Sequence, residues 1–476
     1  MPFALTNDPK LRCLVVAAAM VMFVINLDFF AVQAALPATA LEFGIGTTQL
    51  QWVISGYMLA LASGLVVGGR LADLLGRRTW LFIGAAVFGL ASLVGGAAMS
   101  AEVLVASRVV QGAGAAILMP VSIAVVTNGF AASQTQRAVG LVFGIAAVGQ
   151  ALGPFIGGAI TDSLGWRWVM WINVPLIMLV VLLARRSVQQ SRDETAPRVI
   201  DWAGLVLIVG SVATFTYGID KAASWGWASP QTLGVIACGL MGFGLLVVVE
   251  RRVRFPLLDL DLFGIRSFSV MIIAGVIGNV AMTVTIFVAM VFLQDVEHFS
   301  PMQAGLAFVV FSSGVTLAAQ ISGRLERFAP WAVMDVALLV GGLGVIGMGL
   351  GLGSMPVFLL CSLAAGAGTG LCWSFASVVT QAVVPAQKAG GASGVVLTAL
   401  IGCGGVGVAA ASSFIELRSA ANSPDALVSS IGQVLIATGV LSVLFVPIVT
   451  WLGRMKAKVL AADKVLKPLR FGAFSG

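Results

Sequence analysis

This sequence has few charged residues. Only 10% of its 476 residues are Asp, Glu, Lys or Arg, whereas 59% are hydrophobic and the mean hydropathy is +1.04. A composition this apolar excludes a soluble globular domain and indicates an integral membrane protein. Lys and Arg outnumber Asp and Glu by 27 to 20. This excess does not predict a nucleic-acid partner, because basic residues accumulate in the cytoplasmic loops of membrane proteins.

Residues that bind metals or act as nucleophiles are also scarce. The only histidine, His298, falls in a predicted loop, and the five cysteines lie in apolar stretches without paired spacing. The cysteines, interpreted as small buried hydrophobic residues, are Cys13, Cys238, Cys361, Cys372 and Cys403. The sequence has no G-x-x-x-x-G-K-[ST] loop for ATP. We therefore predict no metal and no cofactor, and a membrane-embedded enzyme is the least favoured class.

Long apolar segments occupy most of the chain. A transmembrane helix needs about 20 mostly apolar residues. Fourteen segments qualify: 13–37, 50–72, 79–99, 103–128, 138–161, 166–185, 201–219, 231–250, 268–293, 303–323, 331–353, 356–381, 391–416 and 427–452. The first is too long for the apolar core of a signal peptide and contains Asp28, so we expect it to be retained. The predicted fold class is an all-α integral membrane protein with 14 transmembrane helices.

Basic residues alternate between the predicted loops in a way that fixes an orientation. With the N-terminus in the cytoplasm, nearly all of the 27 lysines and arginines fall on the inside. Only Arg167, Lys221 and Arg418 fall outside, and Arg108 lies within a helix. Because cytoplasmic loops carry the excess of Lys and Arg, both termini are predicted to be cytoplasmic.

The two halves of the chain share an internal repeat. Four pairs of glycines are each separated by 254 residues: Gly69 and Gly323, Gly112 and Gly366, Gly140 and Gly394, and Gly153 and Gly407. Both members of each pair have the same predicted orientation in the membrane, so the halves are parallel repeats. Such a pair of bundles suits a transporter that rocks around a central cavity, and a duplication in another kind of membrane protein is the alternative.

The repeat predicts the domain organisation. Residues 1–186 and 267–453 form two six-helix bundles. Between them, residues 187–266 contain a polar cytoplasmic loop, beginning near residue 186 and ending near residue 200, and two inserted helices. Residues 454–476 form a basic cytoplasmic tail.

The second predicted helix runs into its loop as GGRLADLLGRRTWL, residues 68–81. Gly69 and Gly76 permit close approach, and Asp73 can pair with Arg77 and Arg78 or with the positive N-terminus of a neighbouring helix. We interpret these five residues as a conformational latch between the halves. The alternative is ordinary positive-inside charge with an incidental acid.

Arg108 lies inside the fourth predicted helix, in the segment SRVVQGAGAAILMP. An arginine there is costly unless it faces a partner or a cavity. Snorkelling is the alternative, because Arg108 is only about 9 Å from the end of its helix. The glycines at positions 112 and 114 on the same stretch favour the interior position.

The fifth predicted helix carries GIAAVGQALGPFIGG, residues 144–158. Its spaced small residues and proline are Gly144, Gly153, Pro154, Gly157 and Gly158. Proline removes a backbone hydrogen bond and bends the helix, whereas the glycines provide a smooth surface for close packing.

These motifs resemble those of the major facilitator superfamily. GRLADLLGRR resembles its G-x-L-A-D-R-x-G-R-K motif, with Leu74 in place of a basic residue, and Arg108 and Gln111 match R-x-x-Q-G-x-G. The resemblance implies that Asp73 and Arg77 stabilise the outward-open state against the second half. The spacing in the fifth helix resembles the motif associated with exporters of the superfamily.

Two further stretches, with the fourteen helices, resemble the fourteen-helix drug:proton antiporter group. LDFFAVQAALP resembles L-D-x-T-x-V-N-V-A-L-P, with Gln33 in place of the usual asparagine, and WRWVMWINVP resembles W-R-W-x-F-x-x-N-x-P. The resemblance implies a monomeric multi-pass protein of the bacterial cytoplasmic (inner) membrane, driven by the proton gradient rather than a cofactor.

Asp28 is the acidic residue deepest in a predicted helix. A carboxylate in that position is costly unless it has a partner or a function. Asp28 and Arg108 are expected at similar depths in adjoining helices, where conformation or cargo can switch the proton affinity of Asp28. We predict that this pair couples protons to substrate; a purely structural hydrogen bond is the alternative for Asp28. The predicted cavity lining is Asn26, Gln33, Tyr57, Gln111 and Gln150.

The predicted function is proton-coupled export of lipophilic, cationic drugs by alternating access. The partners expected are a small-molecule substrate, protons and the lipid bilayer. An exporter of an anionic or neutral metabolite, such as a siderophore, sugar or organic acid, is the alternative on the same fold. No second acid is seen deep in the second half, which predicts a low proton stoichiometry or a limited range of divalent cations.

Overall fold

The computed structural model describes residues 8–466 except residues 48, 131, 193–200, 254–255, 257–259, 323–324, 326–327, 384–388 and 420–423. Regular structure in these residues is helical, and 14 helices are long and apolar enough to cross a membrane. The predicted all-α membrane fold with 14 spans is therefore confirmed. Most of the predicted mid-chain loop, Gly323 of the repeat and the end of the predicted tail lie outside the described residues.

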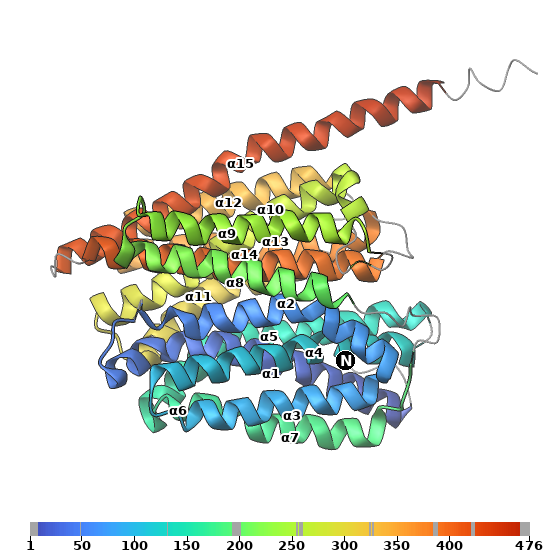
Figure 1. Cartoon of the computed structure of the whole chain (residues 1–476), viewed down its shortest axis with the longest axis horizontal. Coiled ribbons are helices and arrows are strands. Elements are labelled where there is room, and N and C mark those ends of the chain that lie inside the picture. Colours follow the sequence, from blue (N-terminus) through green and yellow to red (C-terminus); the bar gives the residue numbers. More distant parts are fainter. Residues whose placement is uncertain are drawn as a thin grey trace, which may run out of the picture.

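The helices form two bundles that lie side by side (Figure 1). The first comprises α1 (Pro9–Phe43), α2 (Trp52–Leu75), α3 (Arg77–Gly96), α4 (Ala101–Gly129), α5 (Ala132–Leu164), α6 (Arg167–Trp171) and α7 (Asn173–Ser187). The second comprises α10 (Arg266–Val291), which continues as a π-helical turn (Phe292–Val296), α11 (Pro301–Ser322), α12 (Pro330–Leu350), α13 (Met355–Val383), α14 (Ala389–Ser419) and α15 (Pro424–Leu466). Short 3₁₀ turns, Gln49–Gln51 and Leu260–Gly264, precede α2 and α10.

The inserted helices α8 (Trp202–Trp225) and α9 (Pro230–Glu250) form a hairpin beside the seam between the bundles. α8 packs on α14 and, to a lesser extent, on α2. The Gln51 side-chain amide donates a hydrogen bond to Asp220 of α8 over 2.9 Å. The inserted pair therefore contacts both bundles.

The repeat predicted from glycine spacing is present in the helices themselves. Shifting α4 by 254 residues gives the bounds of α13, Met355–Val383. The packing repeats as well, because α2 packs on α4 as α11 packs on α13. The two bundles are thus parallel copies of one arrangement of helices.

Several helices extend beyond the bounds that hydropathy predicts, among them α1, α8 and α15. α1 continues through Pro37 to Phe43. Pro37, Thr39 and Ala40 are buried by neighbouring helices, whereas Leu41 is exposed, and a membrane helix tolerates a proline in such packed surroundings. It ends at Gly44, whose φ of 66° suits a glycine cap. α15 continues to Leu466, so the first part of the predicted tail is helical. The polar stretch after Arg454 is rich in Ala, Leu and Lys, which are good helix formers.

The bundles meet closely at one end of the molecule. We call the end where α1 finishes the Glu42 end, and the end where α2 finishes the Asp73 end. At the Glu42 end, hydrogen bonds join Ser300 to Asp162 (2.9 Å) and Gln49 to Glu416 (3.2 Å) across the seam. The first turn of α11 lies so close to α5 that a Cβ at Gly158 would overlap the Pro301 carbonyl. The structure therefore shows a conformation that is closed at the Glu42 end.

Candidate functional site

A buried ion pair lies at the centre of the first bundle. The Arg108 Nη1 of α4 lies 2.7 Å from the Asp28 Oδ2 of α1, and both side chains are 0% exposed. Two opposite charges at this distance in an apolar bundle attract strongly, but their removal from water is also costly. Such a pair is retained only if its remaining donors and acceptors find partners.

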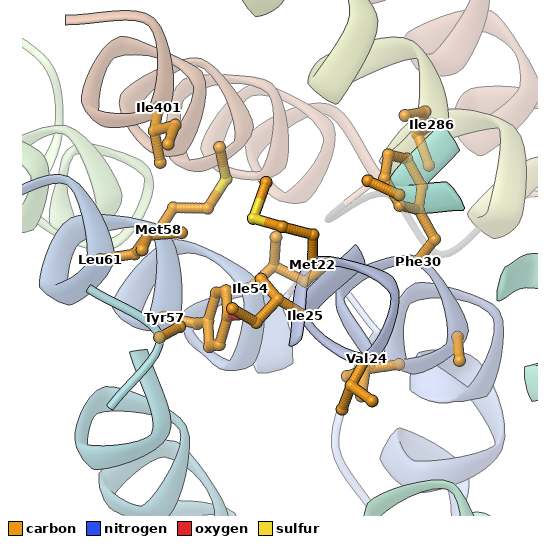
Figure 2. Close-up of a cluster of buried hydrophobic side chains, with 14 of the residues drawn as sticks. Met22, Val24, Ile25, Phe30, Ile54, Tyr57, Met58, Leu61, Ile286 and Ile401 are labelled. Atoms are coloured by element: carbon orange, nitrogen blue, oxygen red, sulfur yellow. The ribbon is translucent and has the colours of Figure 1, made fainter. Parts of the chain in front are cut away.

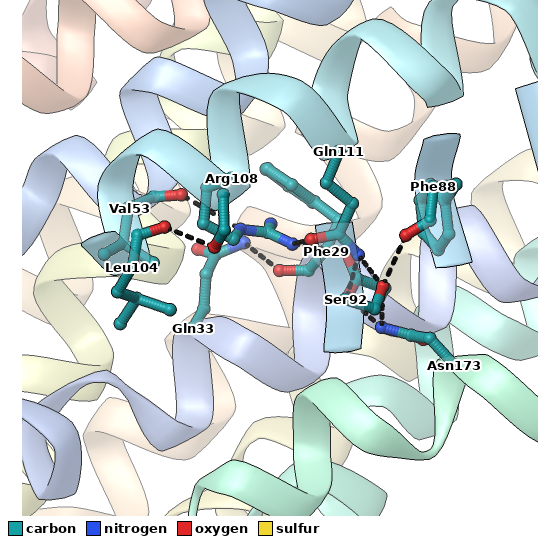
Figure 3. Close-up of polar contacts among 11 residues, drawn as sticks. Phe29, Gln33, Val53, Phe88, Ser92, Leu104, Arg108, Gln111 and Asn173 are labelled. Atoms are coloured by element: carbon teal, nitrogen blue, oxygen red, sulfur yellow. Dashed lines mark hydrogen bonds and ion pairs between the residues drawn. The ribbon is translucent and has the colours of Figure 1, made fainter. Parts of the chain in front are cut away.

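The Asp28 carboxylate is hydrogen-bonded by two neutral amides, those of Gln111 and Asn173, which Figure 3 shows converging with Ser92. Its Oδ1 accepts hydrogen bonds from Gln111 (3.0 Å) on α4 and from Asn173 (2.6 Å) on α7. Ser92 of α3 accepts from both amides, over 2.9 Å from Gln111 and 3.4 Å from Asn173. The carboxylate thus receives donors from two helices and a charge from Arg108.

The guanidinium of Arg108 is held on its other sides as well. Its Nε donates to the Val53 carbonyl over 3.2 Å, and its Nη1 also donates to Gln111 Oε1 over 2.6 Å. The Tyr57 ring of α2 lies 4.2 Å from the guanidinium carbon, a geometry that attracts a cation to the aromatic face. Phe29 of α1 lies against the same ring, with centroids 5.9 Å apart. Arg108 is therefore an interior residue and does not snorkel.

Local sequence explains how these groups meet. Arg108 and Gln111 are three residues apart on α4, so they share one helical face. A break at Ile172 separates α6 from α7 and makes Asn173 the first residue of α7. Asn173 is the asparagine of WRWVMWINVP. This motif is recognisable in the sequence, but the sequence alone assigned no role to its asparagine. Ser92 carried no sequence signal beyond being polar in an apolar stretch.

Several polar atoms around the pair have no hydrogen-bond partner among the described residues. They are Arg108 Nη2, Tyr57 Oη, Asn173 Oδ1 and Gln33 Oε1, all buried. An unpaired polar atom in an apolar interior costs free energy, so native proteins keep few of them. These four atoms are the buried polar groups near the ion pair that a ligand, water or another conformation can satisfy.

The second bundle lacks this network. Adding 254 to Asp28, Arg108, Gln111 and Asn173 gives Met282, Ser362, Ala365 and Leu427. Three of these replacements are apolar, although the helices and their packing repeat. Since the copied bundle forms without the polar cluster, the cluster is not a requirement of the fold.

The other predicted lining residues lie apart from the ion pair or on its edge. Gln33 donates to the Phe29 carbonyl (3.3 Å), and Asn26 donates to the Met22 carbonyl (2.8 Å), both within α1. Gln150 of α5 is only partly buried. Tyr57, Gln111 and Gln33 are at most 1% exposed, so in this conformation packed side chains enclose them.

Apolar side chains flank Tyr57 on the side toward the second bundle. Figure 2 shows Ile25 of α1 beside Tyr57, and Met58 of α2 and Met22 of α1 on the side toward Ile401 of α14. These side chains form an apolar layer to which both bundles contribute, within one buried hydrophobic cluster.

The predicted latch makes its described contacts within the first bundle and with the segment after α7. Asp73 pairs with Arg77, one turn further on, at 2.6 Å. The Arg77 amide donates to the Ser191 carbonyl over 3.0 Å, and the Arg78 amide donates to Gln190 Oε1 over 3.1 Å. Gly76 has a φ of 116°, which glycine adopts without strain. Gly69 lies against Pro120 of α4.

The exporter-type motif brings α5 against two different helices. An added Cβ at Gly153 would lie 2.6 Å from the Phe30 Cβ, and one at Gly157 would overlap Ala31, so both glycines seat α5 on α1. Gly158 faces Pro301 of α11, and reciprocally a Cβ at Gly305 would overlap the Pro154 carbonyl. Gly144 has open space around it.

Comparison with known proteins places this architecture in a family context. The chain matches the Major Facilitator Superfamily over residues 18–410. Multidrug resistance protein Stp of Mycobacterium tuberculosis is 33% identical over 80% of this chain and 71% of its own length. The tetracenomycin C resistance and export protein of Streptomyces glaucescens is 29% identical over 86% of this chain and 77% of its own length. Drug efflux pump JefA of Mycobacterium tuberculosis is 31% identical, over 76% and 72% respectively.

Solved structures share the fold. A bacterial homologue of the human lysosomal transporter Spinster has a TM-score of 0.69 and 16% identity, over 95% of this chain and 99% of that chain. A POT peptide transporter in complex with sulfate has a TM-score of 0.65 and 15% identity, over 92% and 95% respectively. At these identities the likeness shows the fold alone.

Proposed function

This chain belongs to the Major Facilitator Superfamily, and we propose that it is a proton-coupled antiporter that exports lipophilic, cationic drugs by alternating access. The relatives named above are described as resistance, export or efflux proteins, which supports drug export as the general activity. Proton coupling and a cationic substrate are the finer parts of the proposal. They rest on the polar cluster of the first bundle.

The observation that carries the proposal is the enclosed pair of Asp28 and Arg108, at 2.7 Å and 0% exposure. Asp28 is the only carboxylate paired in this way among the described residues of the bundle interiors. A proton on Asp28 removes the charge that compensates Arg108, and a buried arginine without a counter-charge is strongly unfavourable. Protonation therefore favours a conformation in which Arg108 gains water or another partner. This links proton binding to a change of shape.

Antiport requires that drug and proton compete. A lipophilic cation bound beside the apolar layer of Met22, Met58 and Ile401 places positive charge near Asp28, which opposes its protonation. Conversely, protonation of Asp28 leaves a net positive charge on Arg108, which repels the cation. Each ligand thus weakens the binding of the other, and the two occupy the transporter in alternation.

The alternating states fit the two-bundle architecture. Rocking of parallel repeats opens one end while it closes the other. We assign the Glu42 end to the outside and the Asp73 end, with both termini, to the bacterial cytoplasm, on the bias of basic residues. In this assignment Asp73 and Arg77 act on the cytoplasmic rim, and the protein works as a monomer in the cytoplasmic membrane.

The test is efflux of a fluorescent lipophilic cation from cells that express the wild type, Asp28→Asn or Asp425→Asn. Asp425 is an exposed acid in the first turn of α15 and serves as the matched control. We expect wild type and Asp425→Asn to extrude the cation until the proton gradient is dissipated, and Asp28→Asn to lose at least about 90% of this activity. Full proton-driven efflux by Asp28→Asn would show that the assignment of Asp28 is wrong. If the wild type moves no cation, the alternative of an anionic or neutral metabolite is favoured.

A further inference from the structure

We propose that Asn173 is a positioning residue that pairs with the Asp28 carboxyl group in both of its protonation states. The proposal rests on the proposed role of Asp28 as proton carrier. It concerns a residue of α7, at the helix break after Ile172, that lies outside the ion pair itself.

In the ionised state Asn173 acts as a donor. Its Nδ2 lies 2.6 Å from Asp28 Oδ1, closer than the 3.0 Å contact from Gln111 to the same oxygen. Hydrogen bonds to an ionised carboxylate are shorter and stronger than neutral ones. Asn173 therefore makes the closer of the two neutral contacts on that oxygen.

A protonated carboxyl group needs an acceptor instead. Arg108 faces Oδ2 and can only donate, so the added proton belongs on Oδ1, which faces Gln111 and Asn173. The Oε1 of Gln111 is already engaged by Arg108 Nη1 at 2.6 Å. The Oδ1 of Asn173 is buried and has no partner among the described residues. Asn173 therefore supplies the amide oxygen that is free to accept the new O–H.

Rotation of the Asn173 amide by half a turn exchanges the two roles. The NH₂ group and the oxygen of an amide lie equally far along the side chain. After the rotation, the oxygen therefore accepts a hydrogen bond from Asp28 at the place where the NH₂ group had donated one. No backbone movement is needed, because the rotation is about the terminal bond of the side chain. The proton comes from water and binds Asp28 Oδ1, and an N–H···O contact is replaced by an O–H···O contact.

The other groups around Asp28 do not provide this exchange. The charged and titratable groups that face it among the described residues are Arg108 from α4 and, behind Arg108, Tyr57 from α2. α3 contributes Ser92, whose hydroxyl donates to the Phe88 carbonyl over 2.8 Å. α5 faces α1 through glycines.

The test is pH-difference infrared spectroscopy of the purified protein in lipid, for wild type, Asp28→Asn, Asn173→Leu and Asn173→Ser. We expect wild type to show a carboxylic-acid C=O band that Asp28→Asn abolishes. In Asn173→Leu, which has neither donor nor acceptor, this band shifts to higher wavenumber because the acid loses its acceptor. The carboxylate stretching band of ionised Asp28 shifts as well, because the carboxylate loses its closest neutral donor. Asn173→Ser retains a hydroxyl that both donates and accepts, so it moves both bands back toward wild type.

The control is Asn279→Leu, which removes an asparagine of similar burial from α10 of the second bundle. We expect it to leave the acid and carboxylate bands unchanged. The proposal is overturned if the acid and carboxylate bands of Asn173→Leu are both the same as those of wild type. It is also overturned if only the carboxylate band shifts, which is the result for a residue that acts as a donor alone. If wild type shows no band that depends on Asp28, the proposed proton-carrying function fails, and this outcome is distinct from a failure at Asn173.

Discussion

Because Arg108 and Asp28 are buried, each depends on the other to compensate its charge. Exposed ion pairs contribute little because water replaces either partner. Asp73 and Arg77, at the rim of the bundle, are partly exposed. Their ion pair therefore resembles an exposed pair and contributes little to stability. Arg108 has no access to water in this conformation and takes its partners from α1, α2 and its own helix.

The first prediction concerns Arg108→Met, which leaves the Asp28 carboxylate buried without its counter-charge. We expect the free energy of unfolding to fall by about 3–5 kcal/mol. The double variant Asp28→Asn with Arg108→Met removes both charges and should recover most of this loss. Thermal unfolding in detergent, followed by fluorescence of the 11 tryptophans, measures the difference. Equal melting temperatures for Arg108→Met and wild type would contradict the structural role of the pair.

Among the helices, α5 illustrates how one motif serves two contacts. Gly153 and Gly157 seat it on α1 within its own bundle, whereas Gly158 and Pro154 meet α11 of the other bundle. The contact with α1 remains when bundles rock as units, whereas the contact with α11 lies in the seam and must open. The motif thus contains both permanent and conformation-dependent positions.

The second prediction compares two glycines of this motif. Gly158→Ala places a methyl group against the Pro301 carbonyl, and backbone cannot move aside as a flexible side chain can. We expect the conformation closed at the Glu42 end to lose roughly 1–3 kcal/mol, which shifts the equilibrium between states about 5- to 150-fold. Transport should fall because alternating access needs both states. The measurement is initial efflux rate at matched protein abundance.

Gly144→Ala is the control for that experiment, since nothing lies within 4 Å of a Cβ at Gly144. It lies on the same helix and belongs to the same motif, and we expect a rate within about twofold of wild type, as for substitutions away from special contacts. If Gly144→Ala and Gly158→Ala impair transport equally, the motif acts through helix flexibility and not through the seam.

For the whole molecule, closure of one end is the feature that the fold must reverse during transport. Hydrogen bonds from Ser300 to Asp162 and from Gln294 to the Ala34 carbonyl join the bundles at the Glu42 end. The inserted hairpin lies along the same seam through the contact of Gln51 with Asp220. The proposed rocking motion therefore has to separate the two hydrogen bonds that join the bundles.

The third prediction tests this closure directly. In a background without the native cysteines, Asp162→Cys combined with Ser300→Cys places two thiols across the seam at positions whose side chains now lie 2.9 Å apart. We expect a short bifunctional thiol reagent to join α5 to the start of α11 and to stop transport. When the reagent contains a disulfide, reduction should cleave the cross-link and restore activity. Each single-cysteine variant should keep its activity under the same treatment. Continued transport by the cross-linked protein would mean that this seam does not open.

The sequence by itself determined the membrane fold of this protein. Lipid offers backbone groups no hydrogen bonds, so each apolar stretch of sufficient length has to be a helix, and hydropathy counts such stretches directly. The constant spacing of glycines also revealed the repeat in the sequence. Close helix packing requires small residues at fixed positions, so both halves carry glycines at equivalent places. The family resemblance and the special status of Asp28 and Arg108 also came from residues along the chain.

Only the tertiary structure decided which side chains meet. In lipid the faces of a helix toward lipid and toward its neighbours are both apolar, so the sequence gives little information on helix rotation. Whether Asp28 faces α5 or α7 depends on that rotation, and so does the enclosure of Tyr57 and Gln111 instead of their exposure on a cavity wall. The break at Ile172 that presents Asn173 to Asp28 appears only once α7 is placed against α1. The carboxylate was predictable, but its donor Asn173 was not, nor was Ser92, which accepts from Asn173 and Gln111. These contacts join helices that are distant in the chain.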